Sequence, residues 1–239
     1  MIDGENKGLD PPVIWFADGS SLEGNEYVEL KTVLPPYNAA NIQAWNWTGV
    51  NLTKESQGQQ KELDSVQAAV IRELKSRNYQ MIIDDDGKGE VADVVAIQLI
   101  GEASAPSQIN VEFYHCKFSQ AATPGQRIKD LYEVCGQAQK SIVWVSSPDK
   151  KTEIFTHLLR REARRQEAGS STRYELGDGD LLHTIREMSH LTPILLKIFI
   201  VQPGVSKASA TRSQLELLSV TENYLMETYQ IGFGVIGSP

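Results

Sequence analysis

Hydrophobic positions in residues 59–145 recur first with helical and then with strand periodicity. One stripe of KELDSVQAAVIRELKSRN predicts an amphipathic helix. The stripe comprises Leu63, Val66, Ala69, Val70 and Leu74. Three apolar segments follow, YQMIID, EVADVVAIQLI and INVEFYHCKF, and their short connections predict an antiparallel meander. RIKDLYEVCGQAQKSIVWV then returns to helical periodicity, which predicts a second helix packed on these strands.

The pattern on either side of this stretch predicts further elements. VIWFADGSSLEGNEYVEL predicts two short strands around a turn, and IQAWNWTGVNL predicts another extended segment, so residues 1–58 are expected to form a β-rich N-terminal layer. After the second helix, the pattern predicts an arginine-bearing helix, the polar loop GSSTRYELGDGD, the helix LLHTIREMSHL, the strand LLKIFIVQP ended by Pro-Gly, the helix TRSQLELLSVTENYLMETY and the strand IGFGVI. This order predicts a mixed α/β domain over residues 59–239.

Composition is consistent with this domain organisation. A chain of 239 residues, 41% of them hydrophobic, is long enough for one large domain with a smaller addition. It has no apolar run of membrane-spanning length, and its acidic N-terminus is unlike a signal peptide, so we expect a cytoplasmic protein with no membrane partner. In that compartment Cys116 and Cys135 are expected to be buried thiols rather than a disulfide.

The net charge of -8 argues against a surface that binds nucleic acid everywhere, but a local basic patch remains. Four arginines repeat at helical spacing and are expected to share one face that binds nucleic acid. They are Arg160, Arg161, Arg164 and Arg165. The alternative is a solvated helix face on which Glu162 and Glu167 pair with the arginines.

The strand periodicity also brings candidate catalytic residues together. His115 and Lys117 share one face of the third predicted strand, Asp93 lies on the second, and Gln139 arrives from the following helix. A carboxylate among apolar neighbours is costly to bury unless a cation or a hydrogen-bond donor meets it. If Asp93 faces the same side as His115 and Lys117, these groups suit a divalent metal and phosphate chemistry.

These residues resemble the PD-(D/E)xK nuclease superfamily. The resemblance lies in GEVADVV, FYHCK and YEVCGQAQKS, and it covers Leu63 to Val145 and the LLKIFIVQP strand. It implies a restriction-endonuclease-like αβββαβ core flanked by helices, and metal-dependent cleavage of DNA with Mg²⁺ or Mn²⁺. By this resemblance Asp93 binds the metal, Lys117 is the motif lysine, and Gln139 or Gln137 orients the substrate.

The sequence departs from the family's pattern at His115, which stands where the motif has an acid. His115 either replaces the acid as a nitrogen ligand, which Mn²⁺ would tolerate better than Mg²⁺, or another carboxylate supplies the charge. The candidates for that carboxylate are Glu90, Asp86, Asp64 and Glu73. A third interpretation is a degenerate nuclease fold that binds DNA or a partner protein without cleaving.

Two further interpretations bear on the context of this site. The sequence of these motifs is also similar to a segment of large bacterial helicase-type proteins in restriction or anti-phage loci. This similarity implies a helicase partner or a longer chain. Against a functional site, DDDGKG can be an ordinary hairpin turn, His115 a hydrogen-bonded strand residue and Lys117 a snorkelling side chain, while Gln139 caps a backbone group.

Overall fold

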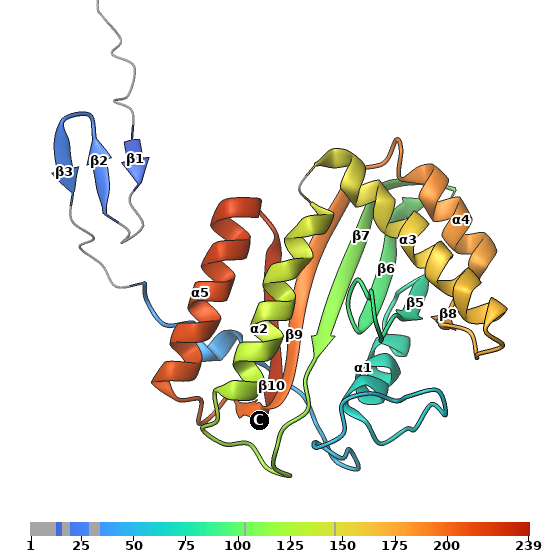
Figure 1. Ribbon diagram of the computed structural model, residues 1–239, viewed down its shortest axis with the longest axis horizontal. Helices are drawn as coiled ribbons and strands as arrows, with labels where there is room; N and C mark the ends of the chain where they lie inside the picture. The colour runs from blue at the N-terminus through green and yellow to red at the C-terminus, as the bar shows by residue number, and fades with distance from the viewer. Residues whose placement is uncertain (1–12, 16–19, 29–33, 103, 146) are drawn as a thin grey trace, which may run out of the picture. The chain divides into compact units, whose positions relative to one another are not determined.

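The chain divides into two compact units, Met1–Pro35 and Pro36–Pro239. Figure 1 shows the computed structural model, which describes residues 13–15, 20–28, 34–102, 104–145 and 147–239. In the first unit β1 (Val13–Trp15), β2 (Ser21–Glu23) and β3 (Glu26–Val28) form a small antiparallel sheet. The rest of the predicted N-terminal layer up to residue 33 lies outside the described residues.

The division between the units falls before Pro36 rather than near Gly58. The segment after Pro36 belongs to the larger unit because β4 (Gln43–Ala44) pairs in parallel with the last strand of the chain. Trp47 reinforces this attachment, since its indole Nε1 donates to the Gly237 carbonyl at 3.1 Å.

The larger unit is built on a seven-stranded mixed sheet in the order β4-β10-β9-β7-β6-β5-β8. Its other strands are β5 (Met81–Asp84), β6 (Val94–Glu102), β7 (Ala105–Cys116), β8 (Tyr174–Leu176), β9 (Ile194–Ser206) and β10 (Gly232–Ser238). The antiparallel meander predicted for the first three core strands is confirmed as β5-β6-β7. β9 runs parallel to β7, and β10 runs parallel to β9, so both connections cross over through helices.

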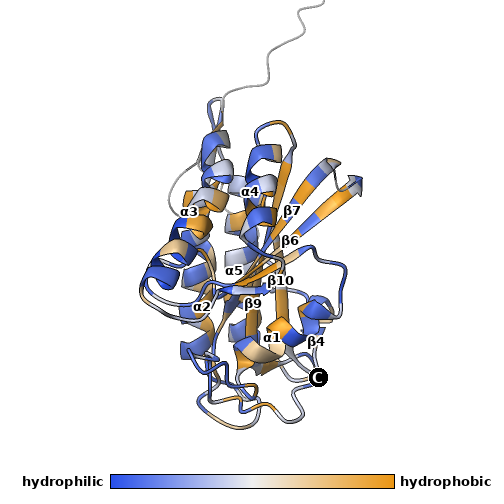
Figure 2. Ribbon diagram, turned by 90° about the vertical axis from the view of Figure 1, so that its right-hand side faces the viewer, coloured by the Kyte–Doolittle hydropathy of each residue, from blue (hydrophilic) through white to orange (hydrophobic). Residues whose placement is uncertain are grey.

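Helices cover both faces of this sheet. They are α1 (Val66–Lys75), α2 (Lys129–Lys140), α3 (Pro148–Glu167), α4 (Gly179–Met188) and α5 (Arg212–Tyr229). α1 packs on one face and the other four pack on the opposite face, so that hydrophobic strands lie between two helical layers (Figure 2). In the described part of the chain, none of these helices combines the length and the apolar character needed to cross a bilayer.

The two-residue period of the strands decides which side chain meets which layer. Val95 and Phe113 are paired across β6 and β7 and join the core with α2 to α5, while Val94 and Tyr114 join the core with α1. Because these pairs are buried on both faces, a slip of one residue would exchange the two cores. The register that positions the ends of β6 and β7 is therefore strongly specified.

Three elements differ from the sequence prediction. α1 begins one turn later than the predicted stripe, because the Ser65 hydroxyl caps the helix at the Ala68 amide and leaves Leu63 76% exposed. β9 does not end at Pro-Gly but continues to Ser206, where a register shift against β10 accommodates the proline. The polar loop after α3 contains β8, an edge strand too short to give a periodic signal.

Candidate metal centre

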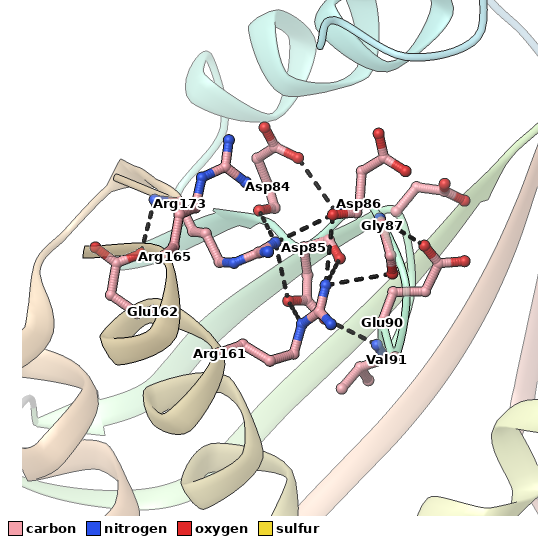
Figure 3. A network of polar contacts seen from close by, with 12 residues as sticks. Asp84, Asp85, Asp86, Gly87, Glu90, Val91, Arg161, Glu162, Arg165 and Arg173 are labelled. Atoms are coloured by element: carbon pink, nitrogen blue, oxygen red, sulfur yellow. Dashed lines mark hydrogen bonds and ion pairs between the residues drawn. The ribbon is translucent and has the colours of Figure 1, made fainter. Parts of the chain in front are cut away.

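The acidic loop between β5 and β6 is held in one conformation by two arginines. Arg161 of α3 lies against the loop, with Nε 2.5 Å from Asp85 Oδ1 and with Nη2 donating to the Asp85 carbonyl at 2.7 Å (Figure 3). Arg173 adds a second contact to Asp85 at 3.5 Å. Gly87 and Gly89 have φ values of 111° and 83°, which side-chain-bearing residues rarely adopt. The Gly-Lys-Gly turn therefore bends the loop back toward β6.

The bend brings three carboxylates together. One side-chain oxygen from each of Asp86, Glu90 and Asp93 lies within 4.8 Å of the others. Asp93 is buried immediately before β6, and Glu90 accepts from the Gly87 amide at 2.9 Å. Within the described part of the chain, no lysine or arginine forms an ion pair with these three carboxylates. Three hard oxygen donors, none of them in a described ion pair, match the ligands that Mg²⁺ and Mn²⁺ prefer.

The electrostatics of this cluster also favour a cation. Burial raises the pKa of Asp93 well above its usual range, and the neighbouring Glu90, Asp86 and Glu55 raise it further. The hydrogen bond from the Cys116 amide to Asp93 Oδ2, at 2.8 Å, opposes this effect only in part. Burial likewise raises the pKa of Glu90, helped by the charge of Asp86. A bound divalent cation would lower both pKa values by compensating the negative charge.

Carboxylates replace the missing partner strand at the end of β7. β6 begins only at Val94, so the amides of Cys116 and Phe118 have no β6 carbonyl opposite them. The Cys116 amide donates to Asp93, and the Phe118 amide donates to Glu55 Oε2 at 3.1 Å. These bonds orient two acidic side chains beside the end of the sheet, where backbone donors would otherwise be unsatisfied.

Lys117 lies between two carboxylates at the same end of β7. Its Nζ is 3.1 Å from Glu55 Oε2 and 3.2 Å from Oε2 of Glu133 in α2. Burial alone would lower the pKa of Lys117, but the hydrogen bonds to Glu55 and Glu133 raise it overall. Lys117 is therefore a fixed ammonium that can donate hydrogen bonds, not a candidate base. Glu55 connects it to Asp93, whose pKa responds to the Glu55 charge.

His115 does not join this cluster. It is 3% exposed and lies on the α2 face of β7, where its Nε2 is 2.8 Å from the Ser141 hydroxyl. Burial lowers its pKa to about 3, with a further contribution from the charge of Lys140. The imidazole is therefore neutral, and among the described residues its Nδ1 has no hydrogen-bond partner. The sequence-based placement of His115 as a metal ligand is not reproduced, because Ser141 holds the ring toward α2.

The two glutamines of α2 occupy different surroundings. Gln139 donates to the Thr221 hydroxyl of α5 at 3.1 Å, so it joins two helices and does not reach the acidic cluster. Gln137 lines a cavity of about 140 Å³ together with His115 and Glu90. Its Oε1 is buried without a hydrogen-bond partner in the described structure. Of the two glutamines, Gln137 is the one that faces the neighbourhood of the cluster.

The comparisons with known proteins add nothing to this geometry. No protein-family model, curated protein or solved structure matches this chain.

The four arginines of α3 do not share one exposed face. Arg161 is buried and its guanidinium is used by the acidic loop, so it is a structural residue rather than part of a surface patch. Arg160 lines a separate cavity beside Trp144. Arg164 and Arg165 lie on the side of the helix that faces the acidic loop.

Among the candidate replacements for the motif acid, Asp86 and Glu90 are at the centre, whereas Asp64 and Glu73 are not. Asp64 pairs with Lys54, and Glu73 of α1 pairs with Arg77, which lies just beyond the end of that helix. Sequence reasoning missed Glu55, because it lies in the irregular segment TKESQGQQ, which has no periodicity to place it.

We predict that His115→Gln leaves Mn²⁺ binding unchanged, because His115 provides no ligand to the cluster. Its pKa in the folded protein, about 3, lies below the value of 6.5 for a free histidine. The contribution of His115 to the free energy of unfolding is thus fully present above pH 6.5. It is lost as the pH falls toward 3, because only the unfolded chain takes up the proton. Between pH 6 and pH 4 the wild type should lose about 1 kcal/mol more per pH unit than the variant in chemical denaturation. Equal pH slopes in the two proteins, or weaker Mn²⁺ binding by His115→Gln, would contradict the placement of His115 as a buried neutral side chain outside the cluster.

Proposed function

We propose that this protein is a metal-dependent nuclease that cleaves phosphodiester bonds of DNA. The observation that carries the proposal is the cluster of Asp86, Glu90 and Asp93 beside the end of β7, in which Asp93 is buried, the other two are half-buried, and none has a described ion-pair partner. The order α1, β5, β6, β7, α2, β9 supports a restriction-endonuclease-like core, in which this end of the meander would hold the reacting phosphate.

Each residue of the centre has a role in this proposal. Asp86, Glu90 and Asp93 would hold Mg²⁺ or Mn²⁺, which stabilises charge on the attacked phosphate and lowers the pKa of a bound water. The Cys116 amide fixes the orientation of the Asp93 carboxylate. Lys117 keeps its proton and provides a positive charge and hydrogen-bond donors to a phosphate oxygen. Glu55 and Glu133 restrict the position of its ammonium group.

The choice of metal tests the composition of the ligand set. Because the cluster contains only oxygen donors, Mg²⁺ is expected to support cleavage as well as Mn²⁺ does, whereas a histidine ligand would favour Mn²⁺. The assay is cleavage of labelled single-stranded and double-stranded oligonucleotides in Mg²⁺, in Mn²⁺ and in EDTA. Cleavage that persists in EDTA, or that Mn²⁺ supports and Mg²⁺ does not, would contradict the oxygen-only metal centre.

A second candidate function is a nuclease-like module that binds DNA without cleaving it. Two observations favour it: His115 stands in the place of the motif acid and faces Ser141, and Lys117 is already paired with two carboxylates. Binding of the same oligonucleotides in EDTA, with no products in either metal, would support this function over the first.

A further inference from the structure

A groove of about 400 Å³ lies next to the acidic cluster, and half of the residues that line it are cationic. It is bordered by the β5–β6 loop, by α3 and by the loop before β8 (Figure 3). The cationic residues that line it are Lys88, Arg161, Arg164, Arg165 and Arg173. Asp84 and Asp86 provide the acidic part of the lining. Asp86 therefore belongs both to this basic groove and to the metal cluster.

The positive charge of the basic groove is only partly compensated within the protein. Arg161 is fully used by the acidic loop, but in the described structure Arg164 and Arg165 form no ion pair. Neither Glu162 nor Glu167 pairs with these arginines in the described structure, and Glu162 instead accepts from the Thr172 hydroxyl and from the Arg173 amide. The alternative in which Glu162 pairs with these arginines is thus not what the structure shows.

Arg173 brings a largely buried guanidinium to the basic groove. Its side chain is 12% exposed and donates from Nη1 to the carbonyls of Asp84 and Asp86, both at 3.2 Å. Its Nε is buried without an acceptor among the described residues. Burial and the charges of Arg161 and Arg165 lower its pKa, which shows that the cations repel one another here. An anion in the groove would relieve this repulsion.

We propose that the basic groove binds a phosphate group of the nucleic-acid strand whose neighbouring phosphodiester lies at the metal cluster. Arginine guanidinium groups match phosphate geometry with paired N–H donors, and Arg164 and Arg165 line the groove together with the ammonium of Lys88. Arg165 uses its Nε to donate to the Ser171 carbonyl at 2.6 Å. Because Asp86 lines both sites, a strand seated in the groove leads directly to the three carboxylates. This inference rests on the proposed function for the identity of the strand. The phosphate can be internal or a 5′-terminal monoester.

Binding is best measured in EDTA, so that cleavage plays no part. The probe is a fluorescent single-stranded oligonucleotide, with or without a 5′-phosphate, titrated at several salt concentrations and followed by anisotropy. The double variant Arg164→Gln, Arg165→Gln should reduce the magnitude of the negative slope of log affinity against log salt by about 1.4 for this single-stranded probe. The matched control is Arg160→Gln, on the same helix but outside the groove, and it should leave the slope unchanged.

The outcomes separate the two proposals. If the wild type prefers the 5′-phosphorylated probe and the double variant does not, the groove binds a terminal phosphate. If the wild type binds both probes equally and the double variant shows the reduced slope, the groove binds an internal phosphate. If the double variant keeps the affinity and salt dependence of the wild type, the groove does not bind a phosphate, even if metal-dependent cleavage is observed. Groove-dependent binding without cleavage in Mg²⁺ or Mn²⁺ would support phosphate binding by the groove and would contradict the proposed nuclease activity. Unchanged thermal unfolding of the double variant would exclude misfolding as the cause of a lost slope.

Discussion

Asp93→Asn is expected to lower cleavage by at least about 100-fold while raising the stability of the metal-free protein. Asparagine keeps an oxygen that accepts from the Cys116 amide but removes a buried charge that Glu90 and Asp86 repel. In EDTA at pH 7.5 the melting temperature should therefore rise by at least about 2 °C. Added Mg²⁺ should raise the melting temperature of the wild type more than that of the variant.

The stability gained by Asp93→Asn should depend on pH, because burial changes the pKa of the Asp93 carboxyl on folding. The pKa of Asp93 is higher in the folded than in the unfolded chain, so its contribution to stability is present at low pH. That contribution is lost as the pH rises through the folded pKa, and the advantage of Asn should shrink from pH 8 toward pH 4. Asp64→Asn is the matched control, because it removes an exposed carboxylate outside the cluster. A variant that cleaves normally, or that is less stable in EDTA, would contradict the assignment.

Arg161→Ala is expected to destabilise the protein by about 3–5 kcal/mol. Its side chain is 7% exposed and pairs with Asp85, which is fully buried. Removing the guanidinium leaves the Asp85 carboxylate with only the more distant Arg173 and frees the carbonyls of Lys88 and Asp85. Because the same loop positions Asp86 and Glu90, cleavage should fall together with stability. Urea unfolding followed by circular dichroism measures the change.

The control for this prediction is Arg160→Ala. Arg160 neighbours Arg161 on α3 but is exposed, so its removal should change the free energy of unfolding by no more than about 0.5 kcal/mol. The double variant Asp85→Asn, Arg161→Ala should recover part of the lost stability, because no unpaired charge remains. If Arg161→Ala is as stable as Arg160→Ala, the loop is not held by this ion pair.

The sequence was sufficient to predict those elements whose hydrophobic periodicity agrees with their tertiary contacts. Three apolar segments with short connections predicted an antiparallel meander, and the structure confirms it as β5-β6-β7. The same pattern did not predict where β9 ends, because Pro203 and Gly204 normally stop a strand while pairing with β10 carries this one past them. Local signals cannot anticipate such a partner.

The sequence predicted only those residues of the candidate site that lie at or near the ends of the strands. Asp93 and Lys117 were found because they stand at the ends of apolar strands, and Glu90 because it adjoins Asp93. Glu55 and Arg173 were not found, since they reach the site from irregular segments distant in sequence. Arg161 was misplaced on an exposed patch, because helical spacing does not reveal that a buried carboxylate lies opposite it.

Titration of the wild-type protein with Mn²⁺, followed by the loss of the free-ion signal in electron paramagnetic resonance, tests the central claim that Asp86, Glu90 and Asp93 form a metal site. We predict a saturable site in the wild type and in Asp64→Asn that is lost in Asp93→Asn. Equal binding by Asp93→Asn, or no binding by the wild type at millimolar Mn²⁺, would contradict it.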